Sequence, residues 1–266
     1  MGCAMLWVIN GPMNARKYRT RLLRVVAGGI VLLAFLLGLA AAKKPELGEH
    51  AVSMLRRHAN TIITIARKVD IQPVAIAGVI AAELTLNHNR IDYAQDLWLK
   101  TRLKLYDDGW WEAWALEMEQ LATESRDVRL ISNKWPISLV WSGYVMSFGP
   151  AQITPRTALL ACKEFKDRPD VCEGSVKQIV SRLLREETAI KLVAVILSVE
   201  AKQWAKCSEH NARADLGLLA TLYSMGGDYY RHRFGKSNPG IVYNYFGRWV
   251  SENGSRISKL LENEMR

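Results

Sequence analysis

Residues 73–86 read PVAIAGVIAAELTL, and every residue between Pro73 and Glu83 is apolar or glycine. Proline suits the first position of a helix, and apolar residues on all faces are typical of a helix buried in a core. Burial at the end of such a helix should raise the pKa of the Glu83 carboxyl group. A carboxyl group that stays protonated near neutral pH can act as a general acid. We therefore expect a buried helix carrying a candidate catalytic acid, with a solvated glutamate at a helix edge as the alternative.

Helical periodicity also dominates the rest of residues 43–266. Apolar residues recur at steps of three and four from Val52 to Val69, which predicts one continuous helix. The other predicted helices are recognised by an apolar face or by their start and stop signals: residues 110–124, a helix from Thr154-Pro155, a long helix from the Ser175/Gln178 capping box to Trp204, Asp215 to Met225 before Gly226-Gly227, and a last helix opened by Asn238-Pro239. No segment predicts a pair of strands, so the fold class is all-α, or nearly so.

The N-terminus has the pattern of a membrane-targeting segment. Residues 25–42 read VVAGGIVLLAFLLGLAAA, an 18-residue run without a charge, which reaches the lower edge of a membrane span. Basic residues precede it, so residues 1–24 are expected to form a cytoplasmic tail and residues 43–266 to be exported to the cell envelope. An uncleaved anchor is the preferred interpretation. A cleaved signal, suggested by the small residues that end the run, and a buried core helix are the alternatives.

The basic charge of the chain is unevenly distributed. The 36 lysines and arginines outnumber the 26 acidic residues, for a formal net charge of +10. Residues 1–42 hold five of these basic residues and no acid, so the remaining chain has an excess of only five. A mild excess suits an anionic wall or membrane surface and does not require nucleic acid as a partner.

Three of the four cysteines lie in the exported part of the chain, where the compartment is oxidising. Cys162 and Cys172 are the preferred disulfide pair because they would close a short loop, which leaves Cys207 unpaired. Three buried free thiols are the alternative. The cysteines have no histidines at metal-ligand spacing, so no metal and no cofactor is expected.

Two further motifs combine glycine with polar residues at helix ends. Residues 147–158 read SFGPAQITPRTA, in which Gly149 permits a sharp turn or a close approach and Gln152 offers an amide to a polar ligand. Residues 223–227 read YSMGG and place Tyr223 beside a glycine stop. An ordinary turn into a capped helix, and a core tyrosine with a C-cap, are the structural alternatives.

Taken together, these motifs resemble the lytic transglycosylase and goose-type lysozyme superfamily, whose members cleave the glycan strands of peptidoglycan. The order is a glutamate at a helix end, then S-x-G-x-x-Q-I-x-P-x-T-A, then Y-x-x-G, over roughly residues 70–250. The resemblance implies a lysozyme-like helical domain with Glu83 as the catalytic acid/base. It also implies that Ser147, Gly149, Gln152 and Tyr223 bind substrate, and that Tyr243 to Val250 corresponds to a terminal helix of the family.

Two features depart from the family pattern. Leu84-Thr85 follows the glutamate where the family usually has serine, and 64 positions separate Glu83 from Ser147. The intervening insertion, at about residues 90–142, contains six of the nine tryptophans. Indole rings can stack on the apolar faces of sugars, so the insertion is expected either to line a glycan groove or to pack its tryptophans onto the core.

The mechanism depends on how many carboxylates act. Glycosidases generally use two, and Asp92 or Asp96 could activate a water as the second. A solvated acid in a loop is the alternative for each of them. The family resemblance implies the one-carboxylate course, in which Glu83 alone cleaves the β-1,4 bond between MurNAc and GlcNAc and the sugar's 6-hydroxyl closes an anhydro ring. A non-catalytic wall-binding or assembly protein is the main alternative. A membrane-anchored interaction protein is the third, favoured if the insertion exposes an apolar patch.

Overall fold

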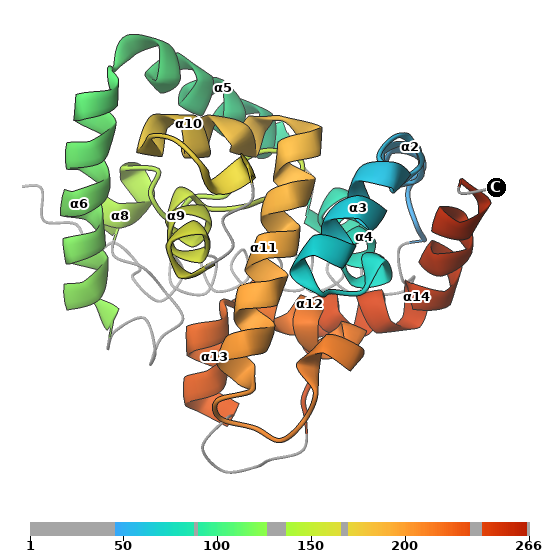
Figure 1. Cartoon of the computed structure of the whole chain (residues 1–266). Coiled ribbons are helices and arrows are strands. Elements are labelled where there is room, and N and C mark those ends of the chain that lie inside the picture. Colours follow the sequence, from blue (N-terminus) through green and yellow to red (C-terminus); the bar gives the residue numbers. More distant parts are fainter. Residues whose placement is uncertain (1–45, 88–89, 127–136, 166–169, 235–240, 265–266) are drawn as a thin grey trace, which may run out of the picture. The chain divides into compact units, whose positions relative to one another are not determined.

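The computed structural model describes residues 46–87, 90–126, 137–165, 170–234 and 241–264. These residues form helices, with an isolated bridge between Phe148 and Ile153 and no strand (Figure 1). The described residues belong to one compact unit, Glu46–Arg266. The predicted tail and apolar segment, residues 1–24 and 25–42, fall outside the described residues. Among the helices of the described ranges, none combines the length and apolar character that a membrane span needs.

The helix predicted from the PVAIAGVIAA sequence is the central element of the fold. This helix, α4 (Pro73–Ala82), is buried at every residue from Ala75 to Ala82. It packs against α3 (Ala59–Val69), α11 (Glu186–Trp204), α12 (Leu216–Met225) and α14 (Tyr245–Asn263). A Cβ atom at Gly78 would lie 2.6 Å from Val250 Cγ1, so this glycine lets α14 approach α4 closely.

The segment from Val52 to Val69 is two helices, so the prediction of one continuous helix was wrong. α2 (Glu49–Arg57) ends at His58, whose backbone angles of φ −111° and ψ 15° are not helical, and α3 starts at Ala59. The ring of His58 is held by Glu186, with Nε2 2.8 Å from Oε2. The apolar pattern stays in step across the break because both helices face the same core.

The predicted long helix from Ser175 to Trp204 is also interrupted. The Ser175/Gln178 capping box is present and opens α10 (Val176–Ser181). A short 3-10 turn, η3 (Arg182–Leu184), follows, and Arg185 is extended before α11 begins. The Thr188 hydroxyl donates to the carbonyl of Arg182 at 2.6 Å, a side-chain bond that stabilises this break.

Most of the other predicted helix ends agree with the structure. α9 (Pro155–Glu164) is capped by Thr154, and α12 ends at Gly226, which has a φ of 78°. α13 (Gly227–Phe234) follows directly. The start of α14 was predicted too early: the helix begins after its cap, Asn244, whereas Asn238-Pro239 lies outside the described residues. The structure contains the expected disulfide, with Cys162 Sγ and Cys172 Sγ 2.02 Å apart, and Cys207 is a free thiol.

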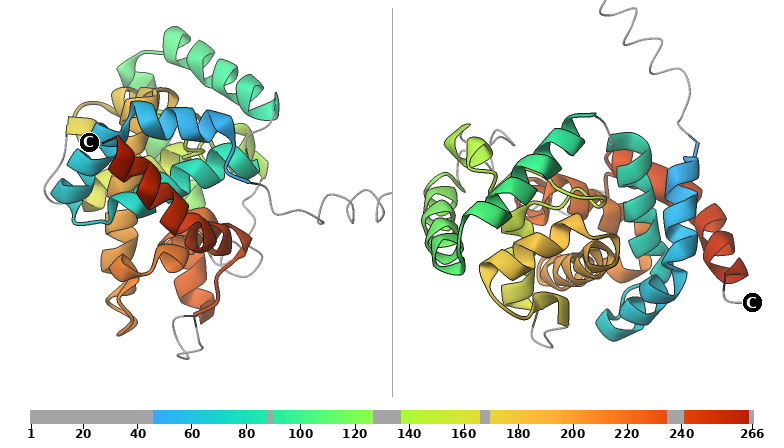
Figure 2. Two further views of the ribbon diagram at one scale, coloured as in Figure 1. Left: turned by 90° about the vertical axis from the view of Figure 1, so that its right-hand side faces the viewer. Right: turned by 90° about the horizontal axis from the view of Figure 1, so that it is seen from above.

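The described residues of the predicted insertion, at about residues 90–142, form three helices, of which only the second was predicted. They are α5 (Arg90–Leu105), α6 (Asp108–Glu124) and α8 (Ile137–Trp141), and Figure 2 shows α5 as an outer helix at the top of its left-hand view. Indole rings join the insertion to itself and to the core. Trp111 and Trp114 are buried and meet edge to face, and Trp98 stacks on Phe148 with ring centroids 5.9 Å apart.

Candidate active site

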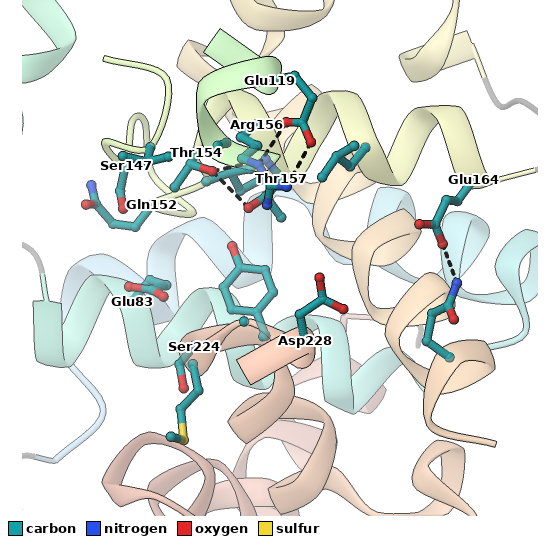
Figure 3. Close-up of a pocket in the computed structure, with 18 of the residues that line it drawn as sticks. Glu83, Glu119, Ser147, Gln152, Thr154, Arg156, Thr157, Glu164, Ser224 and Asp228 are labelled. Atoms are coloured by element: carbon teal, nitrogen blue, oxygen red, sulfur yellow. Dashed lines mark hydrogen bonds and ion pairs between the residues drawn. The ribbon is translucent and has the colours of Figure 1, made fainter. Parts of the chain in front are cut away.

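A cavity of about 880 Å³ opens beside the C-terminal end of α4 (Figure 3). Its size falls within the usual range for ligand pockets. Five of the seven site residues predicted from the sequence line it: Glu83, Asp92, Ser147, Gln152 and Tyr223. Glu83 comes from one wall, and Ser147 and Gln152 face it from the other (Figure 3). Gly149 and Asp96 are not part of the lining.

Glu83 stands where the α-helix widens into the π-turn η1 (Glu83–Asn87). Its side chain is buried, with a relative exposure of 4%, and its Oε2 accepts a hydrogen bond from Asn87 Nδ2 at 2.7 Å. Burial raises the pKa of Glu83 to about 8, the hydrogen bond from Asn87 opposes this rise, and the charge of Asp92 adds to it. Glu83 is therefore protonated at neutral pH, as a general acid must be.

Asn87 is a site residue that no motif in the sequence indicated. The family pattern places a serine directly after the glutamate, and this chain has Leu84 there. In the structure the polar partner of Glu83 comes four residues later instead, because η1 brings Asn87 back beside it. The spacing was visible in the sequence, but the π-turn that makes it effective was not.

Gln152 belongs to a tight loop with unusual backbone angles. Phe148 and Ile153 close the loop with two backbone hydrogen bonds of 3.0 and 3.2 Å. Within it Gly149 has a φ of 69° and Gln152 a φ of 50°, a left-handed conformation that is uncommon for a residue other than glycine. A Cβ atom at Gly149 would collide with the carbonyl oxygen of Leu183, so the glycine serves close packing of the loop instead of contact with a ligand.

Tyr223 links the Glu83 wall to this loop. Its hydroxyl donates to the carbonyl oxygen of Ala151 at 2.5 Å, and its side chain lines the cavity. Burial, with a further contribution from the charge of Glu83, raises the pKa of the Tyr223 hydroxyl well above its usual value. The phenol therefore stays protonated and acts as a hydrogen-bond donor that fixes the residue before Gln152.

Asp92 and Asp96 lie one turn apart on α5 and face different surroundings. Asp92 is buried, lines the cavity and contributes to the raised pKa of Glu83. Asp96 Oδ1 accepts a hydrogen bond from the backbone N–H of Gly149 at 2.8 Å, behind the loop. Of these two aspartates, Asp92 is the one positioned in the cavity as a candidate second carboxylate.

The cavity is also lined by charged side chains in ion pairs that the sequence did not indicate. Arg156 donates two hydrogen bonds of 2.9 Å to Glu119, which joins α9 to α6. Arg231 contacts both Glu200, at 2.5 Å, and Asp228, at 2.9 Å. Arg156 stands inside the motif that marked the site, but its partner is 37 positions away. The cavity lining therefore includes ion-paired side chains besides Glu83 and Asp92.

The described part of residues 90–142 contributes polar side chains to the cavity, among them Asp92 and Glu119, but no tryptophan. None of the tryptophans whose side chains the structure describes lines the cavity. The exposed apolar side chains of α5 are Tyr93, Leu97 and Leu105, with relative exposures of 73%, 54% and 71%. Leu97 and Leu105 also line a second hollow of about 430 Å³ along α5, together with Trp98 and Tyr106. This patch is the feature expected of an interaction surface, and it coexists with the polar cavity.

The described residues contain no group of three or more histidine, cysteine or acidic side chains arranged to hold a metal ion. The cavity offers the protonated carboxyl group of Glu83, a second carboxyl group on Asp92, amides, hydroxyls and ion-paired charged side chains. Comparisons of the chain with models of known protein families, with curated proteins and with solved structures give no match.

Proposed function

We propose that this helical unit is a divergent lysozyme-like domain that cleaves the glycan strands of peptidoglycan, with Glu83 as its acid. The observation that carries the proposal is a buried, protonated carboxyl group at the wall of an 880 Å³ cavity. Gln152 and Tyr223 line the same cavity, which the family resemblance requires of them. A core glutamate with a purely structural role has no need of a ligand-sized space beside it.

The proposed reaction needs one carboxyl group. Glu83 gives its proton to the oxygen between MurNAc and GlcNAc, the bond from that oxygen to the MurNAc anomeric carbon breaks, and GlcNAc leaves with the proton. The Glu83 carboxylate then takes the proton of the MurNAc 6-hydroxyl as its oxygen attacks the anomeric carbon. The product is a 1,6-anhydro ring, and Glu83 is protonated again. No water is consumed.

Hydrolysis is the second candidate reaction, and Asp92 is the residue that favours it. Asp92 lines the cavity and is close enough to Glu83 for its charge to raise the pKa of that group. If Asp92 activates a water, the product has a reducing end in place of the anhydro ring. The mass of the product therefore distinguishes the two reactions.

The proposed setting is the cell envelope. The apolar run at residues 25–42 and the basic residues before it support a membrane anchor, which would hold the domain against peptidoglycan on the outer side of the membrane. A non-catalytic wall-binding protein with the same fold is the alternative, and a third is an interaction protein that uses the exposed apolar residues of α5.

The test is cleavage of purified sacculi by the full-length protein in detergent micelles, with mass analysis of the products. We expect anhydro products from the wild type and a loss of about two to four orders of magnitude in rate for Glu83→Gln. Glu117→Gln makes the same chemical change at an exposed position and should retain full activity. A wild type that binds sacculi without cleaving them would support the wall-binding alternative and refute this proposal.

A further inference from the structure

The insertion touches the Gln152 loop at two points through α5. Asp96 Oδ1 accepts the N–H of Gly149 at 2.8 Å. Two residues further along the chain, Trp98 stacks on Phe148, the residue at the base of the loop, with ring planes only 6° apart. These two contacts connect a helix that follows Glu83 in sequence to the opposite wall of the cavity.

The loop needs such support because its own hydrogen bonds are few. It has one backbone bridge, at Phe148 and Ile153, and one turn bond from the Gln152 N–H to the Gly149 carbonyl oxygen at 3.1 Å. Gly149 and Gln152 are in left-handed conformations. A left-handed backbone costs roughly 1 to 2 kcal/mol for a residue other than glycine, so Gln152 keeps this conformation only if its neighbours hold it. Tyr223 holds the loop at Ala151 from one side. Asp96 holds it at Gly149 from the other.

Gly149 relays the support from Asp96 to the side chain of Gln152. Its N–H donates to Asp96, and its carbonyl oxygen accepts a hydrogen bond from Gln152 Nε2 at 3.1 Å. The chain of contacts therefore runs from a carboxylate on α5, through one residue of backbone, to the amide that faces Glu83. Asp96 itself is not part of the cavity lining and cannot touch a substrate bound there.

We propose that Asp96 is a positioning residue that holds Gln152 against the substrate by fixing Gly149. This inference rests on the proposed function and adds a role for the insertion, which otherwise separates the two motifs. An error of about 1 Å in the position of a group that orients substrate can cost about 100-fold in rate. The loss of the Asp96 contact is therefore expected to reduce turnover although Glu83 and its surroundings are untouched.

A matched control exists in the same insertion. Asp107 Oδ1 accepts the N–H of Trp110 at 2.8 Å, which is the same kind of bond at the same length, but at the start of α6. Asp107→Ala and Asp96→Ala each remove one aspartate-to-backbone hydrogen bond. Only Asp96→Ala releases the loop, so a loss common to both variants would reflect stability and not positioning.

The experiment compares the full-length wild type, Asp96→Ala, Asp96→Asn and Asp107→Ala in micelles. It measures kcat and KM on sacculi, the pH profile, and amide exchange in the peptide covering residues 147–153. For Asp96→Ala we expect a kcat lowered about 10- to 100-fold, faster exchange in that peptide, and an unchanged basic limb of the pH profile. Asp96→Asn keeps an acceptor oxygen and should restore part of the loss. Asp107→Ala should match the wild type in all three readouts.

The outcomes separate the inference from the proposed function. An Asp96→Ala protein with wild-type kcat, or with unchanged exchange in residues 147–153, would overturn the positioning role even if the wild type is an active glycosidase. An equal loss of kcat in Asp107→Ala would overturn it as well. A wild type without any cleavage defeats the proposed function, and exchange alone then decides whether Asp96 holds the loop.

Discussion

Glu83 and Gln152 face the same cavity, but Glu83 stands at the end of a buried helix and Gln152 in a loop with almost no regular structure. The helix α4 is held by apolar packing along its whole length, so the position of Glu83 depends on the core. The position of Gln152 depends on a few polar contacts from Tyr223 and, through Gly149, from Asp96. Substitutions in the two walls should therefore have different effects on stability and activity.

Among substitutions in the loop wall, Gly149→Ala should have the largest effect. In Gly149→Ala the new Cβ would strike the carbonyl oxygen of Leu183, and a left-handed φ of 69° is unfavourable for alanine. We expect a free energy of unfolding lowered by about 2 to 4 kcal/mol and a rate of cleavage lowered by about 100-fold. Chemical denaturation and sacculus cleavage measure the two effects.

Gly109→Ala serves as the control for this variant. The nearest atom to a Cβ atom at Gly109, Asp107 Oδ1, lies 3.6 Å away, and the position is in the first turn of α6. This variant should be as stable as the wild type or slightly more so. If Gly149→Ala is also as stable as the wild type, the loop does not pack closely against Leu183.

The helix wall should respond to pH through Glu83. Its pKa of about 8 in the folded protein lies above the ordinary value of 4.5, so the folded state keeps a proton that the unfolded chain releases. The stability of the wild type should therefore fall as the pH rises from about 4.5 to 8. Glu83→Gln lacks this penalty and should be more stable at pH 8, by roughly 2 to 5 kcal/mol.

Thermal unfolding of both proteins from pH 5 to 8 measures this difference. The difference in Tm between the wild type and Glu83→Gln should increase steadily with pH. The exposed control Glu117→Gln should have the Tm of the wild type throughout. A gap that is constant across the range would mean that Glu83 releases its proton as an ordinary surface glutamate does.

The smallest expected effect comes from Asp92. Its charge contributes less to the pKa of Glu83 than burial does, so Asp92→Asn should move the basic limb of the pH profile only slightly toward lower pH. Anhydro products should persist in this variant. Loss of cleavage together with loss of reducing-end products would instead identify Asp92 as the group that activates water.

The same contrast explains what the sequence could predict. The buried helix and its unusual glutamate were recognised from local composition, and the caps at Thr154 and Ser175 from local spacing. The break at His58 was missed because the apolar pattern continues through it.

The support of the loop was missed for a different reason. Asp96 and Gly149 are 53 positions apart, and no local pattern connects them. Gly149 was predicted to permit a sharp turn or an approach of the backbone to a ligand, whereas the group that it approaches is the backbone of Leu183. The structure of the loop wall depends on contacts between distant parts of the chain, whereas the helix that carries Glu83 could be predicted from local composition.

The central claim is that the cavity wall carries a carboxyl group that is protonated near neutral pH. Difference infrared spectroscopy of the full-length wild type against Glu83→Gln isolates the carbonyl band of that group as the pH is raised. The account predicts a band that is present at pH 7 and disappears with a midpoint near pH 8. A midpoint near 4.5, the ordinary value for glutamate, would contradict it and remove the basis for assigning Glu83 as the acid.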